Sequence, residues 1–365
     1  MILTRNVIIT CGTGGVGKTT VSAALGVRAA MLGRKALVIT IDPAKRLVTS
    51  LGLDALGDQA TDLTPLIKNA CEKLGGTCLG SLDALMPDTK KTLEDFVYAF
   101  APTPAAAEKV LKNPIFSILA KEFSGSNEYM ALYRLKTLDE MNYYDTIILD
   151  TPPSRHTITF LNTPRVMKQF LEERMVRWLL LPTNRIFSAG LRKALGLLEK
   201  LTGAGFVTQM LDLAESLYQI QDIALDTVKK LESLLESEKV GFLMVTAPNP
   251  ETVPELIHLI ESLHQYRFRF EGLVLNRTLS AFKISEDEWA QAHQEVERNR
   301  PDLIYGLKIL DALQTREKRL IEALRNKLAN ETGAFYSVLP ELVRDVHSVE
   351  DLYYVADGLK NTQPI

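Results

Sequence analysis

The stretch Gly12-Thr13-Gly14-Gly15-Val16-Gly17-Lys18-Thr19 decides how this 365-residue chain is interpreted. It satisfies the pattern G-x-x-x-x-G-K-[S/T], in which glycines let the backbone turn so tightly that successive N–H groups converge on phosphate oxygens. The pattern follows an apolar run at residues 6–11 (NVIITC) and precedes an alanine-rich stretch at 19–32 that ends at Gly33. A strand, a glycine-rich loop and a helix in this order predict a phosphate site at a helix N-terminus.

Each part of this loop has an expected role. Lys18 is expected to contact the β- and γ-phosphates of a nucleotide and to act in catalysis, and the Thr19 hydroxyl is expected to bind Mg²⁺. A glycine-rich turn without a ligand is the alternative, and the matching strand and helix on either side disfavour it. The predicted phosphate-binding residues are Gly12, Thr13, Gly14, Gly15, Val16, Gly17, Lys18, Thr19 and Thr20.

Other short apolar segments indicate the fold around this loop. They are rich in β-branched residues and lie at 35–41, 146–150, 240–246, 272–276 and 335–339. Their continuous apolar character is typical of strands that are covered on both faces. We therefore predict an α/β fold, a doubly wound and mostly parallel sheet of the P-loop nucleotide triphosphatase type, with an inserted helical subdomain.

Two long stretches interrupt the alternation of strands and helices. Residues 93–142 have helical spacing broken by prolines, and residues 163–239 carry apolar side chains every three or four positions. We expect both to be insertions that pack into a smaller helical subdomain. The predicted boundaries are 1–92 for the first part of the nucleotide-binding domain, 93–142 for a helical insert, 143–162 for the second switch region, 163–239 for the helical subdomain and 240–365 for the last, adenine-side part.

Two aspartates end predicted strands. Asp150 closes the segment TIILD before Thr151-Pro152-Pro153, and a carboxylate there can hold Mg²⁺ through a water molecule. Its alternative role is to cap a strand–loop junction. Asp42 closes the second strand and can orient a water molecule toward the γ-phosphate, or else cap a helix that begins at Pro43. Spacing alone leaves both interpretations of Asp42 open.

Composition excludes several classes of protein. The chain is 46% hydrophobic and 24% charged with a formal net charge of -3, which lacks the basic excess of a dedicated nucleic-acid-binding protein. Cys11, Cys71 and Cys78 form no CxxC pair, so we expect no disulfide framework and no zinc site. Neither a signal peptide nor an apolar run long enough to span a membrane is evident, which predicts a cytoplasmic protein.

The ordered set of motifs resembles the ArsA-like ATPases, which include the arsenite-pump ATPase and the ATPases that target tail-anchored membrane proteins. The loop GTGGVGKTT is similar to the family's GKGGVGKTT, Asp42-Pro43-Ala44 is similar to its first switch, and residues 150–157 (DTPPSRHT) are similar to its second switch. Asn276-Arg277 and Leu339-Pro340-Glu341 stand where the family contacts adenine. The resemblance covers nearly the whole chain and is weakest in the inserted helices.

This resemblance implies a Mg²⁺-dependent ATPase related to the ParA, MinD and nitrogenase iron-protein ATPases. It also implies a dimer that ATP closes face to face, in which the helical subdomains bind a client. Asp42 would then orient the attacking water and His156 would report the phosphate state. The resemblance further implies switch roles for Pro43, Arg46, Asp150, Pro153 and Arg155, and adenine contacts for Asn276, Arg277 and Pro340.

The chain departs from the family at Thr13, where members carry a second lysine that neutralises phosphate charge across the dimer. Lys45, Arg46 or Arg155 could supply that charge, although each is by itself more simply a solvated surface residue. Alternatively, the chain forms a heterodimer with a lysine-bearing paralogue. A third possibility is a slow or non-hydrolysing nucleotide switch.

The client is not evident from the residues. Arsenite binding needs clustered thiolates, which three scattered cysteines do not predict. The apolar segment at 176–182 (VRWLLLP) has two alternative interpretations: we expect it either to pack inside the helical subdomain or to bind a hydrophobic or membrane-associated protein. A ParA- or MinD-like positioning ATPase is disfavoured by the long helical inserts and by the lack of an evident C-terminal amphipathic membrane helix.

Overall fold

The computed structural model of the chain describes residues 3–41, 46–122, 126–151, 154–172, 205–279, 286–331, 333–342 and 344–364. These residues form two compact units. The first, here called the α/β unit, comprises Met1–Met86, Met141–Ile158 and Ser237–Ile365. The second, here called the helical unit, comprises Pro87–Glu140 and Thr159–Glu236.

A nine-stranded sheet organises the α/β unit, with the strand order β3-β4-β2-β5-β1-β6-β7-β8-β9. All neighbours pair in parallel except the two edge strands, β3 and β9, which are antiparallel to theirs. The predicted α/β fold with a mostly parallel sheet is thus confirmed. The strands are β1 (Val7–Gly12), β2 (Lys35–Thr40), β3 (Thr61–Asp62), β4 (Ser81–Leu85), β5 (Thr146–Asp150), β6 (Val240–Thr246), β7 (Phe270–Thr278), β8 (Phe335–Pro340) and β9 (Thr362–Pro364).

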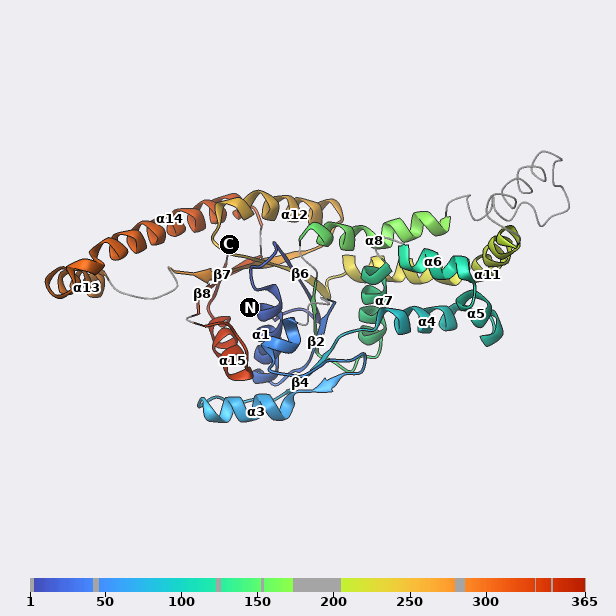
Figure 1. Cartoon of the computed structure of the whole chain (residues 1–365), viewed down its shortest axis with the longest axis horizontal. Coiled ribbons are helices and arrows are strands. Elements are labelled where there is room, and N and C mark those ends of the chain that lie inside the picture. Colours follow the sequence, from blue (N-terminus) through green and yellow to red (C-terminus); the bar gives the residue numbers. More distant parts are fainter. Residues whose placement is uncertain are drawn as a thin grey trace. The chain divides into compact units, whose positions relative to one another are not determined.

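The helices of this unit cover both faces of the sheet. Figure 1 shows α1, α3 and α15 on one side of the strands and α12 and α14 on the other. Strands β1, β5 and β6 are accordingly buried along their whole length, as their continuous apolar character predicts. The helices are α1 (Lys18–Met31), α2 (Arg46–Ser50), α3 (Thr64–Lys73), α12 (Val253–Gln265), α13 (Glu286–Asn299), α14 (Ile304–Leu328) and α15 (Val349–Gly358), with short 3-10 turns at Pro250–Thr252 and Pro301–Leu303.

Helix α1 begins directly after the phosphate loop and ends where the sequence indicates. Gly33 follows it with a φ of 86°, and its N–H donates to the carbonyl of Ala30 at 3.1 Å. A glycine in this left-handed conformation is a common helix end because it lacks the Cβ that would clash. The phosphate loop therefore joins the end of β1 directly to the start of α1.

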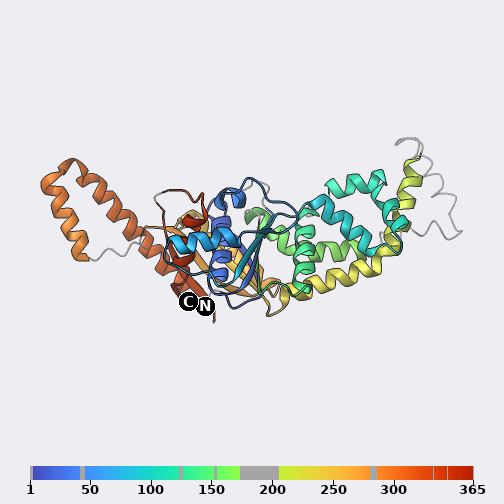
Figure 2. The same cartoon turned by 90° about the horizontal axis from the view of Figure 1, so that it is seen from below.

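The segment between β7 and β8 forms a helical hairpin that the sequence analysis did not predict. Helices α13 and α14 run antiparallel in it (Figure 2). Asp311 on α14 joins them, since it accepts a hydrogen bond from Trp289 Nε1 and lies 2.9 Å from His293 Nε2. The hairpin is therefore held by a polar cluster as well as by packing.

The helical unit is built from α4 (Thr89–Phe100), α5 (Pro104–Leu111), α6 (Pro114–Glu122), α7 (Ser126–Glu140), most of α8 (Ser154–Glu172) and α11 (Phe206–Glu236). An aromatic cluster joins α4 to α7, with Phe96 packed edge to face against Tyr129 and Tyr133. Along α11, the apolar residues at helical spacing are buried, including Leu213, Ile220, Val228 and Leu235. Among the described residues, no helix is long and apolar enough to cross a membrane.

Candidate nucleotide-binding site

The phosphate loop begins at the last residue of β1. A Cβ on Gly12 would lie only 1.9 Å from the carbonyl oxygen of Val245 on the neighbouring strand β6, so no other residue fits there. Gly15 and Gly17 have φ values of 77° and 87°, a left-handed conformation that glycine adopts at little cost. Close packing and positive φ together explain why these glycines are needed.

Lys18 lies at the floor of this loop. Its side chain is 6% exposed, and its Nζ donates hydrogen bonds to the carbonyls of Gly12 and Thr13, both at 3.1 Å. The loop therefore holds its ammonium group in place before any ligand arrives. Together with Thr19, Thr20 and Thr151, Lys18 lines a hollow of about 400 Å³, which we call the phosphate hollow.

Asp150 is fully buried beside the loop. Strand pairing sets Asp150 opposite Thr10 on β1 and opposite Thr40 on β2. Thr40 Oγ1 donates to Asp150 Oδ2 at 3.0 Å, and Ser22 Oγ donates to Oδ1 at 3.2 Å. Burial raises the pKa of the Asp150 carboxyl to about 6, while hydrogen bonds from Thr19, Thr40 and Ser22 and the charge of Lys18 oppose that rise.

Thr19 and Asp150, the two residues predicted to hold Mg²⁺, are in hydrogen-bonding contact. A hydroxyl and a carboxylate are the hard oxygen donors that Mg²⁺ prefers, and such sites usually take their remaining ligands from phosphates and water. The donor set therefore fits this ion. No cluster of three or more histidine, cysteine or acidic side chains that could hold a metal occurs within the described part of the chain.

Thr13 faces inward. Its side chain is 2% exposed, and its hydroxyl has no hydrogen-bonding partner among the residues that the structure describes. It also lines neither of the hollows described in this subsection. Thr13 thus adds no positive charge to the phosphate hollow and does not reach outward from the loop.

Asn276 and Arg277 close the other side of the loop. Asn276 Nδ2 donates to the carbonyl of Val16 at 2.8 Å and would lie 2.3 Å from a Cβ on Gly17, so strand β7 packs directly on the loop. The β7–β8 pairing shifts register between Leu275 and Thr278, and Arg277 there has a φ of 61°. Such a bulge redirects a side chain, and Arg277 lines two adjoining hollows.

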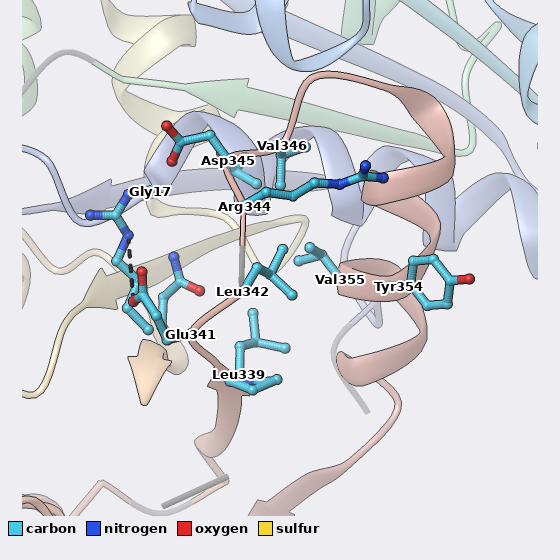
Figure 3. A pocket seen from close by; sticks show the side chains of 13 residues that line it. Gly17, Leu339, Glu341, Leu342, Arg344, Asp345, Val346, Tyr354 and Val355 are labelled. Carbon is cyan, nitrogen blue, oxygen red and sulfur yellow. Dashed lines mark ion pairs between the residues drawn. The ribbon is translucent and has the colours of Figure 1, made fainter. Parts of the chain in front are cut away.

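The second hollow, of about 80 Å³, we call the base hollow. Its apolar side chains come from the end of β8, from the loop that follows β8 and from α15; they are Leu339, Leu342, Val346 and Val355 (Figure 3). It shares lining residues with the phosphate hollow, so the two spaces adjoin. A slot that combines apolar side chains with polar ones suits a flat nucleobase. The shared residues are Gly17, Thr20, Arg277, Asp345 and Val346.

The site brings together most residues that the sequence analysis proposed. Pro340 lines the base hollow, and Arg46, at the start of α2, lines the phosphate hollow. Sequence reasoning missed Arg344, Asp345 and His347, which line one or both hollows. A signal was available, because they follow the carboxyl end of a parallel strand, where ligands of such sheets bind.

Several proposed residues are not placed by the structure. Asp42, Pro43, Lys45 and Pro153 lie outside the described residues, as does the apolar segment at 176–182. Arg155 and His156 fall in the first turn of α8, but their side chains are not described. The proposed roles of these residues therefore stay predictions.

The fold and the site define a P-loop nucleotide-binding protein of the α/β class. A sequence model of the family described as "Anion-transporting ATPase" matches residues 5–307, so the chain belongs to that family and is a P-loop ATPase. It is 27% identical over 298 residues to the putative arsenical pump-driving ATPase 2 of Aquifex aeolicus, covering 79% of this chain and 84% of that protein. It is also 26% identical over 324 residues to the ATPase ASNA1 homolog 2 of Paramecium tetraurelia (86% and 89%) and 25% identical over 325 residues to the ATPase get3 of Aspergillus niger (87% and 85%).

Proposed function

We propose that this chain binds MgATP in the two adjoining hollows and couples its hydrolysis to a conformational change in the helical unit. The observation that carries the proposal is the preformed phosphate hollow, in which Lys18 is already held by two loop carbonyls beside Thr19. Electrostatic stabilisation by fixed groups is the main way in which proteins catalyse phosphoryl transfer. The nucleobase would occupy the base hollow between Pro340 and α15.

The roles of individual residues follow from this placement. Loop N–H groups and Lys18 would bind the phosphates. Thr19 would bind Mg²⁺ directly, and Asp150 would bind it through a water molecule. The ion, when bound, would neutralise phosphate charge that develops during the reaction. Asp42 would orient the attacking water, by resemblance to the family.

The coupling to the helical unit is supported by chain connectivity. Asp150 ends β5, and α8 begins only four residues later at Ser154. From Thr159 onward the same helix belongs to the helical unit. A small shift of the β5 end on nucleotide binding would therefore reach that unit through a continuous helix, with Arg155 and His156 in its first turn.

A specific observation favours a second candidate, a nucleotide switch that hydrolyses slowly alone or works beside a lysine-bearing paralogue. Thr13 is buried and adds no charge to the phosphate hollow. Because a missing cation in a phosphoryl-transfer site reduces the rate by about 10³- to 10⁵-fold, this substitution favours slow turnover. Both candidates bind MgATP, and only turnover separates them.

The client that we propose is a hydrophobic or membrane-associated protein bound by the helical unit. Arsenite is a less suitable ligand for this chain. Burial raises the pKa of the Cys11 thiol to about 12 and also raises the pKa values of Cys71 and Cys78, so all three favour the thiol over the metal-binding thiolate.

Steady-state ATP hydrolysis by the purified chain tests the proposed function. We expect Mg²⁺-dependent turnover by the wild type and its loss in Lys18→Ala, while Lys90→Ala on α4, an exposed lysine, should turn over like the wild type. Equilibrium binding of a fluorescent ATP analogue should accompany the assay. Tight binding without turnover would favour the nucleotide switch, and absence of binding by the wild type would contradict both candidates.

A further inference from the structure

The lysine and arginine side chains that line the phosphate hollow among the described residues are Lys18, Arg46 and Arg277. Lys18 is held at the floor by the carbonyls of Gly12 and Thr13. Arg277 belongs equally to the base hollow, and its Nε lies 4.0 Å from Glu341 Oε2. Arg277 is thus directed toward the base end of the site.

Arg46 differs from both. It is exposed, it is the first residue of α2, and it lines the phosphate hollow but not the base hollow. Residues Thr49 and Ser50 of the same short helix line the same hollow, so α2 forms one of its walls. Arg46 therefore borders the phosphate hollow from a different element than the lysine of the loop.

The charge of the ligand calls for such a group. A nucleoside triphosphate with its magnesium ion carries more negative charge than a single lysine neutralises, and the deficit grows at the terminal phosphate as its bond to the diphosphate breaks. A guanidinium presents a planar fork of donors that matches phosphate oxygens in two places at once. Asp345 is the acidic residue of the described lining, and it lies at the end shared with the base hollow.

We propose that Arg46 is a further catalytic residue, which contacts the terminal phosphate of ATP and supplies positive charge that Thr13 does not. This inference rests on the proposed MgATP site. In the reaction, an oxygen of water forms a bond to the γ-phosphorus while the bond to the β–γ bridging oxygen breaks. The electron pair stays on the ADP oxygen, the water proton leaves with inorganic phosphate or solvent, and Arg46 stabilises the charge on the γ-phosphate oxygens throughout.

The test compares Arg46→Ala and Arg46→Lys with the wild type and with Arg300→Ala as a matched control. Arg300 is an exposed arginine of the same unit that pairs with Asp302 and lines neither hollow. We expect Arg46→Ala to lower kcat by about 10³-fold, the lower end for such arginines. The kcat of Arg46→Lys should lie between the values of Arg46→Ala and the wild type, because lysine keeps the charge but lacks the planar fork of donors. The kcat of Arg300→Ala should match the wild-type value.

A binding measurement separates this inference from the proposed function. The affinities of a non-hydrolysable ATP analogue and of ADP are measured by calorimetry for each variant. The wild type should prefer the triphosphate, Arg46→Ala should lose that preference while binding ADP within about threefold of the wild type, and a fold probe such as circular dichroism should be unchanged. A kcat of Arg46→Ala within twofold of the wild-type value would overturn the role of Arg46. If the wild type has no turnover, an unaltered triphosphate preference in Arg46→Ala would overturn it. A wild type that binds no nucleotide at all would instead overturn the proposed function.

Discussion

At the scale of single residues, Asp150 shows how a candidate binding site is placed at the expense of stability. Its carboxyl is completely buried, and three hydroxyls together with Lys18 only partly compensate for the water that it loses. A group whose presence disfavours the folded state in the absence of ligand is typical of binding sites. The bound ion would provide the compensation that the protein alone lacks.

The raised pKa of Asp150 gives a prediction with a definite sign. The ordinary pKa of 3.8 applies to the unfolded chain and about 6 to the folded one, so the folded state binds more protons between these values. Stability from this group is therefore highest below about pH 4 and falls, by about 3 kcal/mol, as the pH rises through 6. The predicted change is that Asp150→Asn becomes more stable relative to the wild type as the pH rises.

The measurement is urea unfolding of both proteins without nucleotide or Mg²⁺ at several pH values from 4 to 7. Taking the difference between the two proteins removes the opposite contribution of other acids such as Asp62 and Glu350, whose pKa values are lowered. MgATP should reverse the trend, since its binding strengthens as Asp150 ionises. A difference that stays constant with pH would show that the folded pKa of Asp150 is ordinary.

At the scale of elements, the sequence predicts the central strands closely. The predicted strands at 146–150 and 240–246 coincide with β5 and β6, and the helix expected at 19–32 corresponds to α1 with each end shifted by one residue. The two strands are buried along their whole length, so their apolar runs are uninterrupted. The phosphate loop joins β1 to α1 and Asp150 ends β5, so this half of the candidate site lies next to elements that the sequence indicates clearly.

Elements with polar interruptions were missed. Strand β4 (SLDAL) contains Asp83, which accepts a hydrogen bond from Tyr144 Oη at 2.8 Å, a long-range contact that no local pattern reveals. Helices α13 and α14 carry many charges and few buried side chains. The contact of Asn276 with Val16 joins residues far apart in the chain and likewise depends on the assembled sheet.

Two glycines inside helices provide a matched prediction about packing. A Cβ on Gly26 of α1 would lie 2.6 Å from Val38 Cγ2 and 2.8 Å from Leu82 Cδ1, whereas a Cβ on Gly306 of α14 would meet nothing within 4 Å. Gly26→Ala should therefore destabilise the α/β unit by about 1–3 kcal/mol through overpacking. Gly306→Ala should stabilise its helix by up to about 1 kcal/mol because alanine favours the helical backbone.

Amide hydrogen exchange resolved by segment measures both effects in their own elements. Faster exchange across α1 and its neighbouring strands is expected for Gly26→Ala, and slower exchange confined to α13 and α14 for Gly306→Ala. If Gly26→Ala exchanged as slowly as the wild type, Val38 and Leu82 would have to move aside freely, which their complete burial in the core argues against.

At the scale of the whole molecule, the candidate nucleotide site is a surface feature of one unit. Arg46, Asp345 and His347, which line the phosphate hollow, are exposed, so water reaches a nucleotide bound to a single chain. Water competes for the same phosphate oxygens and weakens every electrostatic contact in the hollow. A second chain covering this face would exclude that water, which agrees with the dimer that the family resemblance implies.

The last prediction is therefore that MgATP drives self-association of this chain. Sedimentation velocity at micromolar protein should show a monomer without nucleotide and a dimer with a non-hydrolysable ATP analogue and Mg²⁺, because covering the charged hollow is favourable only when its charges are matched by the ligand. Lys18→Ala should remain monomeric under both conditions, and Arg300→Ala should behave as the wild type. A wild-type chain that binds the analogue tightly yet stays monomeric would contradict the homodimer. Association would then be expected only after a paralogue that carries lysine at the position of Thr13 is added.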